Sequence, residues 1–290
     1  MIQRIYDKLK YEYLRAATNG SSFLKSNPSK QSLVLKYAQE DVPELFVNVM
    51  AAKLSDGTCG AKVIRVDEKT GNTTSYTTVY KPDGTAMIVE SADLTRLRCG
   101  MMAALSAEFY LGRSALNSET RVGFIGNGRT NIKTAQVFFE LFGIRKFVIC
   151  GHPSFPARNY DKFIEYGNVE VASRDNGYEP LRKCDIVISC TNTVSECDIL
   201  EYEQLKGPRL FISQDGGYIF GESFRKECGT FSDHPTQLLH AAPHEFPWDK
   251  GELSVVFPIE MLEKLPVSDK VPAVYLYGIA LADVVVAIGG

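Results

Sequence analysis

The chain has 290 residues, of which 44% are hydrophobic and 23% are charged, and its formal net charge is −3. This composition is ordinary for a globular protein, and the length allows two domains. The slightly acidic balance lacks the basic footprint of a nucleic-acid-binding protein, so we expect no such partner. The N-terminal residues lack a signal-peptide core. The most apolar segment, residues 271–290, contains Asp283, so we predict a buried helix there, not a membrane span.

The cysteines and histidines show no metal-binding or disulfide pattern. Seven cysteines are scattered along the chain without a C-x-x-C pair, and the four histidines form no H-E-x-x-H motif. We therefore predict reduced thiols, a cytoplasmic protein and no metal site.

The first 118 residues have the pattern of a helix followed by an antiparallel sheet. Residues 2–17 are spaced like an amphipathic helix that Asn19 and Gly20 end. Apolar, threonine-rich or β-branched runs predict strands at residues 33–35, 45–50, 60–66, 73–80 and 85–90. A long helix then begins near Ser91 or Asp93, either of which can cap it, and ends near Gly112.

The segment R-V-G-F-I-G-N-G-R-T-N, residues 121–131, predicts a strand, a glycine turn and the start of a helix. These are the parts of a dinucleotide phosphate cradle, where glycine admits the pyrophosphate and free helix N–H groups meet its charge. Asn131 replaces the third glycine of G-x-G-x-x-G, which weakens the motif. Later strands at 147–150 and 184–191 support a parallel sheet. We expect cofactor contacts from Gly126, Asn127, Gly128, Arg129, Thr130, Asn131, Cys190, Thr191 and Asn192.

The strand at residues 146–150 bears on the choice of nicotinamide cofactor. An NAD-binding domain usually ends its second strand with an acid that bonds the ribose 2′-hydroxyl. Here no acid follows until Asp161, whereas the loop carries His152, Ser154 and Arg158. We therefore predict NADP(H) over NAD(H), with Arg158 or Arg129 stacking on the adenine or pairing with the 2′-phosphate. The alternative is an ordinary polar loop that accepts both cofactors.

Three features of the chain together resemble the ornithine cyclodeaminase/mu-crystallin family. Leu94 to Cys99 is similar to that family's L-T-x-x-R-T helix start, and Gly60 to Val63 is similar to its G-x-K-x strand. The Gly126 turn and the strand at 185–191 are similar to its G-x-G-x-Q-A loop and A-D-I-V strand. Their order spans nearly the whole chain, so the combination is more specific than any single motif.

The resemblance implies an α/β fold in which a Rossmann-type domain, residues 119–258, is inserted into the chain. Residues 1–118 and 259–290 would form the substrate-binding and dimerisation domain of a homodimer. The family's chemistry is hydride transfer between nicotinamide and the α-carbon of an amino acid or its imine.

The resemblance also assigns roles to individual side chains. Arg98 would clamp the substrate carboxylate. Lys62, in an otherwise apolar strand, would exchange a proton with the substrate nitrogen, a role suited to a lysine whose pKa burial lowers. Further substrate contacts are implied for Lys30, which replaces a family arginine, and for Thr73 or Thr74.

Asp215 is the nearest acid to the position of the cyclodeaminase aspartate, but it stands out of register by a residue or more. It either holds a substrate amine or caps a turn, which puts ornithine cyclisation in doubt. Two rivals stay open: a catalytically weak NAD(P)H-binding protein of the mu-crystallin type, and a 2-hydroxy acid dehydrogenase that would use His234 or His240.

Overall fold

A computed structural model describes residues 1–18, 27–35, 45–67, 73–151, 157, 159–173, 176–191, 199–217, 219–239, 257–263 and 270–289. The chain divides into two units. Unit 1 consists of Met1–Arg98 with Gly278–Gly290, and unit 2 consists of Cys99–Tyr277. The domain bounds expected from the sequence, 1–118 with 259–290 and 119–258, stay a prediction.

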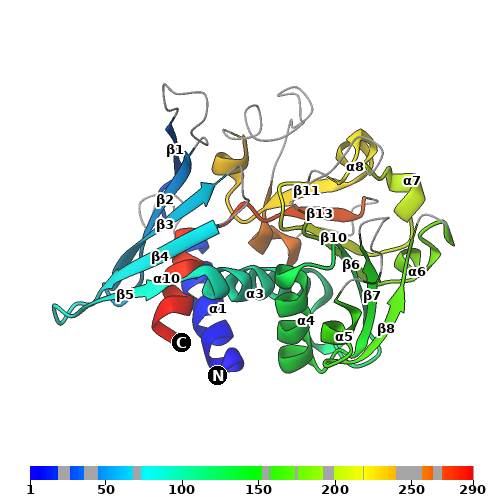
Figure 1. Ribbon diagram of the computed structural model, residues 1–290, viewed down its shortest axis with the longest axis horizontal. Helices are drawn as coiled ribbons and strands as arrows, with labels where there is room; N and C mark the ends of the chain where they lie inside the picture. Colours follow the sequence, from blue (N-terminus) through cyan, green and yellow to red (C-terminus); the bar gives the residue numbers. More distant parts are fainter. Residues whose placement is uncertain are drawn as a thin grey trace. The chain divides into compact units, whose positions relative to one another are not determined.

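Unit 1 is an antiparallel sheet with two helices on one face. Helix α1 (Ile2–Thr18) packs against helix α10 (Ala280–Gly289), which also contacts the central strands (Figure 1). The strands run in sequence order as a meander: β1 (Gln31–Leu35), β2 (Leu45–Lys53), β3 (Cys59–Asp67), β4 (Thr73–Tyr80) and β5 (Ala86–Glu90). The predicted first helix and all five predicted strands are confirmed.

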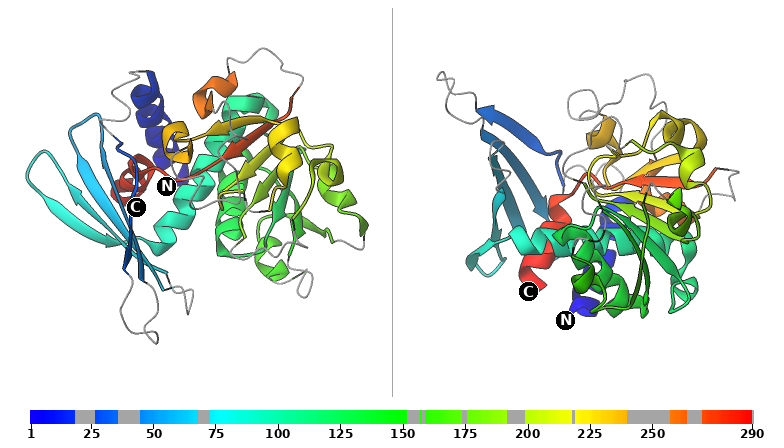
Figure 2. Two further views of the ribbon diagram at one scale, coloured as in Figure 1. Left: turned by 90° about the horizontal axis from the view of Figure 1, so that it is seen from above. Right: turned by 45° about the vertical axis from the view of Figure 1, so that its right-hand side comes forward.

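Only one face of this sheet is covered by helices. Figure 2 shows α1 and α10 against the same face, and no described segment of unit 1 lies on the other. The alternation of burial along β3 and β4 follows from this arrangement, because successive side chains point to opposite faces. On β3, Lys62 is buried whereas Val63 is exposed, and on β4, Val79 is buried whereas Tyr80 is exposed.

Helix α3 (Ala92–Leu111) follows the sheet, and its residues are shared between the two units. Ser91 stands at its start, where its carbonyl accepts a 2.8 Å hydrogen bond from the Thr95 N–H. Of the two predicted caps, Ser91 therefore occupies the capping position. Its hydroxyl donates 3.1 Å to the Ser75 hydroxyl on β4, which ties the helix start to the sheet.

Unit 2 is built on an eight-stranded parallel sheet with the strand order β12-β11-β13-β10-β9-β6-β7-β8. Its strands are β6 (Arg121–Ile125), β7 (Lys146–Cys150), β8 (Asn168–Val171), β9 (Ile186–Ser189), β10 (Leu210–Ser213), β11 (Gly229–Ser232), β12 (Phe257–Pro258) and β13 (Pro272–Tyr275). The chain runs outward from β6 through β7 to β8 and then crosses back to β9, which pairs with the other side of β6. This reversal is the topological switch point where Rossmann-type sheets bind dinucleotides.

The core of unit 2 is largely apolar and partly aromatic. All four residues of β9, β10 and β13 are buried, as expected for strands covered on both faces. Phe211, Phe220 and Phe224, the last in the short helix α8 (Glu222–Glu227), pack with centroid distances of 4.5 to 5.9 Å. The rings of Phe220 and Phe224 are stacked, and both meet the Phe211 ring edge to face. Burial raises the pKa of Cys150 and Cys184 to about 12, so these thiols stay protonated at neutral pH.

Within the apolar segment 271–290, we expected the helix to span residues 271–287, and this prediction is wrong in its first half. Pro272–Tyr275 form β13, which pairs in parallel with β10 on one side and β11 on the other. Helix α10 begins only at Ala280, after Gly278 has turned the chain with φ +95°. A short apolar run does not distinguish a buried strand from a buried helix, and proline is tolerated as the first residue of a strand. The remaining helix packs on α1 and the sheet of unit 1, as predicted.

Candidate functional site

A buried lysine marks the covered face of the sheet in unit 1. Lys62 lies in the middle of β3 and is 0% exposed. Its strand neighbours in register are Met50 on β2 and Thr77 on β4, and both are buried. An ammonium group in such a place requires a counter-charge and hydrogen-bond acceptors.

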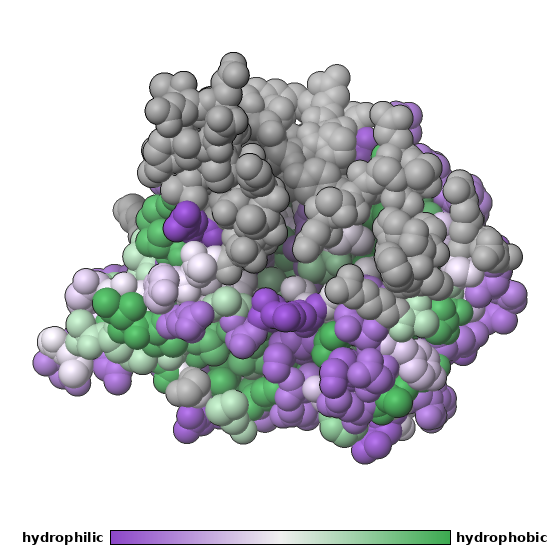
Figure 3. Space-filling model, viewed as in Figure 1, coloured by the Kyte–Doolittle hydropathy of each residue, from purple (hydrophilic) through white to green (hydrophobic). Residues whose placement is uncertain are grey.

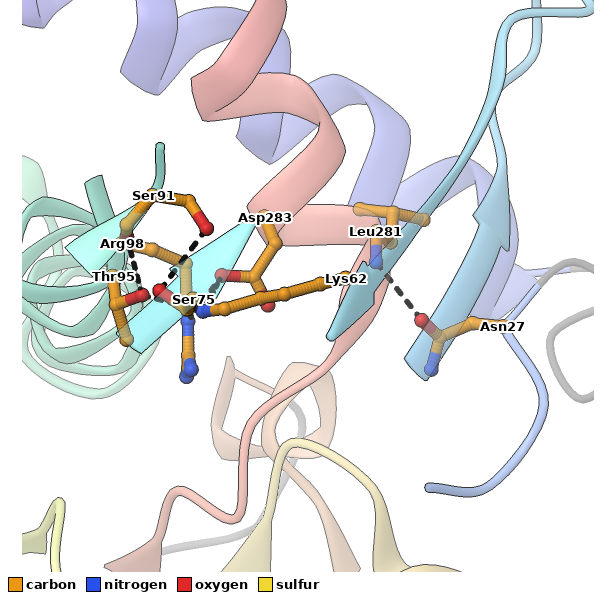
Figure 4. A network of polar contacts seen from close by, with 8 residues as sticks. All are labelled: Asn27, Lys62, Ser75, Ser91, Thr95, Arg98, Leu281 and Asp283. Atoms are coloured by element: carbon orange, nitrogen blue, oxygen red, sulfur yellow. Dashed lines mark hydrogen bonds and ion pairs between the residues drawn. The ribbon is translucent and has the colours of Figure 1, made fainter. Parts of the chain in front are cut away.

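Helix α10 supplies that counter-charge. The Lys62 Nζ donates 2.7 Å to Asp283 Oδ1 and 2.5 Å to Thr95 Oγ1 (Figure 4). The Thr95 hydroxyl in turn donates 2.6 Å to the Ser91 carbonyl. The ammonium is therefore held by a carboxylate from α10 and a hydroxyl from α3, although its own backbone belongs to β3.

Arg98 is the second cation of this cluster. It lies one turn after Thr95 on α3, it is 6% exposed, and its Nε is 3.4 Å from the same Asp283 Oδ1. Asp283 Oδ2 is buried without a hydrogen-bond partner among the described residues. Lys62, Arg98 and Asp283 form a cation cluster, in which the two cations share one carboxylate. The paired donors of a guanidinium suit the binding of a carboxylate ligand.

The described contacts of the cluster do not include the other predicted substrate residues. Lys30 is half-buried just before β1. Thr74 is exposed on β4 and lies on the face opposite to Lys62, because it pairs with Arg65 whereas Lys62 pairs with Thr77. The side chain of Thr73 lies outside the described part of the chain. All three roles stay predictions.

In unit 2, the glycine turn after β6 leads into helix α4 (Arg129–Phe142). Gly126 has φ +89°, and a Cβ there would lie 2.3 Å from the Cys190 carbonyl oxygen at the end of β9. No side chain other than hydrogen fits at this position. A Cβ on Gly128 would meet nothing within 4 Å, so the turn is open beside the first N–H groups of α4. The open turn and the unpaired amides of a 14-residue helix fit a pyrophosphate.

Asn131 explains how the turn forms without its third glycine. The side chain is fully buried, and its Nδ2 donates 3.0 Å to the Ile125 carbonyl and 2.7 Å to the Gly126 carbonyl. The amide thus ties the end of β6 to the first turn of α4. Its expected contact with the cofactor stays a prediction, and the geometry supports a role inside the turn.

The remaining predicted cofactor contacts divide into two groups. Arg129 is exposed at the start of α4, whereas Asn127, Thr130, Cys190 and Thr191 are partly buried around the switch point. The others lie outside the described residues: His152, Ser154, Arg158 and Asn192.

Asp215 is occupied by hydrogen bonds within unit 2. Its Oδ1 accepts from the hydroxyls of Ser189 and Ser213 and from the Gly217 N–H, at 2.7 to 3.1 Å. Its Oδ2 accepts from the N–H and the hydroxyl of Thr191, at 2.7 and 3.0 Å. Five donors match or exceed what one carboxylate accepts. The structure therefore supports the turn-capping alternative, and the catalytic assignment of Asp215 stays a prediction that this geometry does not favour.

His234 is likewise held by its surroundings. It is 1% exposed, and its Nδ1 accepts a 3.1 Å hydrogen bond from the Gln237 N–H. This bond uses one ring nitrogen of His234 within the chain itself. His240 lies outside the described residues. Among the described residues, no group of histidine, cysteine and acidic side chains could hold a metal ion. No helix in that part of the chain combines the length and apolarity that a membrane span needs.

Sequence reasoning missed Asp283 and Thr95 as members of the cation cluster. A signal for Asp283 was present, because it is the single charged residue in the apolar helix A-L-A-D-V-V-V-A-I-G. A lone acid on a fully buried helix needs a cationic partner in the fold. Thr95 is the threonine of the L-T-x-x-R-T motif, but the motif gave it no partner, because a threonine in the first turn of a helix is common.

The fold and these two sites define a two-unit α/β protein with a dinucleotide-type cradle in one unit and a buried cation cluster in the other. Its fold is shared by solved structures of low sequence identity. The Thermococcus litoralis Δ1-pyrroline-2-carboxylate reductase in complex with NADH and L-proline is 16% identical, with a TM-score of 0.71 over 99% of this chain and 91% of that chain. A lysine cyclodeaminase is 15% identical, with a TM-score of 0.73 over 99% and 84% of the two chains.

The iminosuccinate reductase of Paracoccus denitrificans in complex with NAD+ is 16% identical, with a TM-score of 0.70 over 99% of this chain and 90% of that chain. A search of curated proteins found no match. The ornithine cyclodeaminase/mu-crystallin family model matches residues 30–224, and the chain belongs to this family.

The Lys62–Asp283 pair generates a prediction about stability. Removal of one partner from a buried pair costs about 3–5 kcal/mol of unfolding free energy. We expect Asp283→Leu to cost more than Lys62→Met, because it leaves both Lys62 and Arg98 without this carboxylate. The double variant should lose less than the sum of the two, as urea denaturation followed by circular dichroism will measure.

The control for this cycle is an ion pair of similar length on the surface. Arg121 Nη2 lies 2.7 Å from Glu170 Oε2, and both side chains are partly exposed. Glu170→Gln should cost under about 1 kcal/mol, since solvent screens the pair. Strict additivity of the Lys62 and Asp283 substitutions would contradict the coupling.

Proposed function

We propose that the protein is a nicotinamide-dependent oxidoreductase that acts on the C–N bond of an α-imino acid or an amino acid. The observation that carries the proposal is the buried cluster in which Lys62 and Arg98 share the Asp283 carboxylate. Family membership and the open glycine turn of unit 2 support it. The similar folds include a Δ1-pyrroline-2-carboxylate reductase, an iminosuccinate reductase and a lysine cyclodeaminase.

Each of these groups would have a separate role in the reaction. The Arg98 guanidinium would bind the substrate carboxylate through paired N–H donors and so orient the α-carbon. Lys62 would hold a proton at the substrate nitrogen, which gains it as the C=N bond becomes a single bond. The Gly126 turn and the first N–H groups of α4 would hold the pyrophosphate. When bound, nicotinamide supplies the hydride.

Among the family's reactions, reduction of an imine fits better than cyclisation of a diamino acid. A diamino acid carries a second ammonium group, which needs an acidic partner. Asp215 was the candidate for that partner, and its oxygens are already occupied by five hydrogen bonds. The presence of both Arg98 and Lys62 also supports turnover over mere cofactor binding. The free thiols of the described cysteines support the proposed cytoplasmic location.

The first test of this function concerns Arg98. NADPH or NADH oxidation should be screened with a panel of cyclic imines and with mixtures of 2-oxo acids and amines. On the best substrate, Arg98→Ala should lose about 2–5 kcal/mol of transition-state stabilisation in kcat/KM. Arg98→Lys should recover only part of this, because lysine lacks the forked donors. Full kcat/KM in Arg98→Ala, or no turnover by wild type across the panel, would contradict the proposal.

We further propose NADP(H) as the preferred cofactor. Strand β7 ends at Cys150, and the next acid along the chain is Asp161 in the short helix α5 (Tyr160–Phe163), where it is exposed. An acid at the end of this strand would have repelled a 2′-phosphate. Arg129 is exposed beside the open turn and can reach an anionic group.

Calorimetric titration will compare the two cofactors. NADPH should bind more tightly than NADH, and Arg129→Ala or Arg158→Ala should reduce that difference by about tenfold, since a charge-assisted contact contributes about 1.4 kcal/mol or more. Arg209→Ala is the control, because Arg209 is exposed at the amino end of β10, whereas Arg129 follows the carboxyl end of β6. Tighter binding of NADH, or equal effects of all three substitutions, would reject the assignment.

The uncovered face of the unit 1 sheet supports a homodimer. Its exposed side chains include Val63 at 42%, Tyr76 at 53%, Tyr80 at 54% and Ile88 at 73%. The register places Val63 beside Tyr76 and Thr78 beside Ile88, so these residues form one surface. Green apolar side chains are visible over this unit in Figure 3. A contiguous apolar patch on a sheet face marks an interaction site, and we propose that a second copy of the chain covers it.

Light scattering after size exclusion at micromolar concentration will test the dimer. Ile88→Asp should convert a dimer to a monomer, because it buries an unpaired charge in the interface. The matched control is Ile164→Asp, which places the same charge on an exposed isoleucine of unit 2. A monomeric wild type, or a dimer that tolerates Ile88→Asp, would contradict this interface.

A further inference from the structure

The short segment from Gly278 to Asp283 contacts each of the chain's candidate carboxylate-binding segments in unit 1. Asp283 pairs with Lys62 of β3 and approaches Arg98 of α3. Two further contacts of this segment bear on Arg98 and on the residues before Lys30. The first is a packing contact of a backbone, the second is a hydrogen bond from a backbone N–H, and neither joins opposite charges.

The first of these contacts fixes the position of Arg98. Gly278 has φ +95°, and a Cβ there would lie 2.9 Å from Arg98 Nη1, 3.1 Å from Nη2 and 3.3 Å from Cζ. All three distances are shorter than ordinary van der Waals contact, so the guanidinium lies against the bare backbone of Gly278. Any side chain at this position would push the guanidinium away.

The second contact joins α10 to the segment that carries Lys30. The Leu281 N–H in the first turn of α10 donates 2.9 Å to Asn27 Oδ1, and Asn27 is 1% exposed (Figure 4). This bond satisfies one of the free N–H groups at the helix start. It also fixes the backbone three residues before Lys30.

We propose that Gly278 and Asp283 are positioning residues for the carboxylate-binding cations. Because Gly278 has no side chain, the Arg98 guanidinium can lie against its backbone. Asp283 holds Lys62 and attracts the Arg98 Nε. Neither is assigned a contact with the reacting atoms. The segment therefore sets the geometry in which a carboxylate meets Arg98. This inference rests on the proposed function for the identity of the ligand as an imino carboxylate.

The variant that isolates this role is Gly278→Ala, because it displaces the guanidinium without removing a charge. Gly84→Ala is the matched control. Gly84 has φ +85°, so alanine there is similarly strained, but its Cβ would meet nothing within 4 Å. The control therefore measures the cost of the backbone conformation alone.

Two measurements are needed, one of them independent of turnover. In steady-state reduction of Δ1-pyrroline-2-carboxylate with NADPH, Gly278→Ala should raise KM at least about tenfold and change kcat less, since a displaced fork loses a charge-assisted hydrogen bond. In calorimetry with pyrrole-2-carboxylate, a planar carboxylate that accepts no hydride, Kd should rise by a similar factor. The Kd of NADPH and all constants of Gly84→Ala should stay near wild type.

The outcomes separate this inference from the proposed function. Equal carboxylate affinity in Gly278→Ala and Gly84→Ala overturns the positioning role, even if the wild type reduces the imine. A wild type that binds the pyrrole carboxylate without reducing any imine overturns the reaction, and the calorimetric comparison then decides the positioning role alone. A wild type that binds no carboxylate probe overturns both.

Discussion

The buried ion pair of Lys62 and Asp283 is the constraint on which the first unit depends. An ammonium group with 0% exposure carries a desolvation cost of several kcal/mol, which only a close counter-charge and hydrogen-bond acceptors can offset. The counter-charge comes from a position 221 residues later in the chain, 2.7 Å away in space. The last helix must therefore return to the first sheet. The parallel sheet of unit 2 is formed by the chain that intervenes.

This return also explains how the apolar segment near the C-terminus is divided. Its first part completes the parallel sheet as β13, and its second part forms α10 on the antiparallel sheet. Gly278 lies between them, turns the chain and leaves room for the Arg98 guanidinium. The buried cations thus belong to one unit, and the glycine turn that leads into α4 belongs to the other.

Much of this architecture was predictable from local patterns. Lys62 stood out as a lysine in an otherwise apolar strand, and strand, glycine turn and helix marked the cradle. The long-range pairing of Asp283 with Lys62 was not predictable, because no local pattern links the two residues. The division at Gly278 was missed because strands and buried helices share apolar composition. Asn131 was expected to contact the cofactor, and Asp215 was expected either to hold a substrate amine or to cap a turn. The described side-chain hydrogen bonds of both residues are made within the chain itself. From sequence alone, a polar residue in a turn is equally consistent with a ligand contact and with a hydrogen bond that stabilises the turn.

The most direct test of this account is NMR of lysine ammonium groups in protein labelled with 15N at the lysine side chains. A buried ammonium that donates to Asp283 and Thr95 should exchange its protons slowly with water. The account predicts one slowly exchanging lysine ammonium signal that disappears in Lys62→Met. That signal should lose its protection in Asp283→Asn while the other lysine signals stay unchanged. A Lys62 signal that exchanges as fast as those of surface lysines, or one that is indifferent to Asp283→Asn, would contradict it.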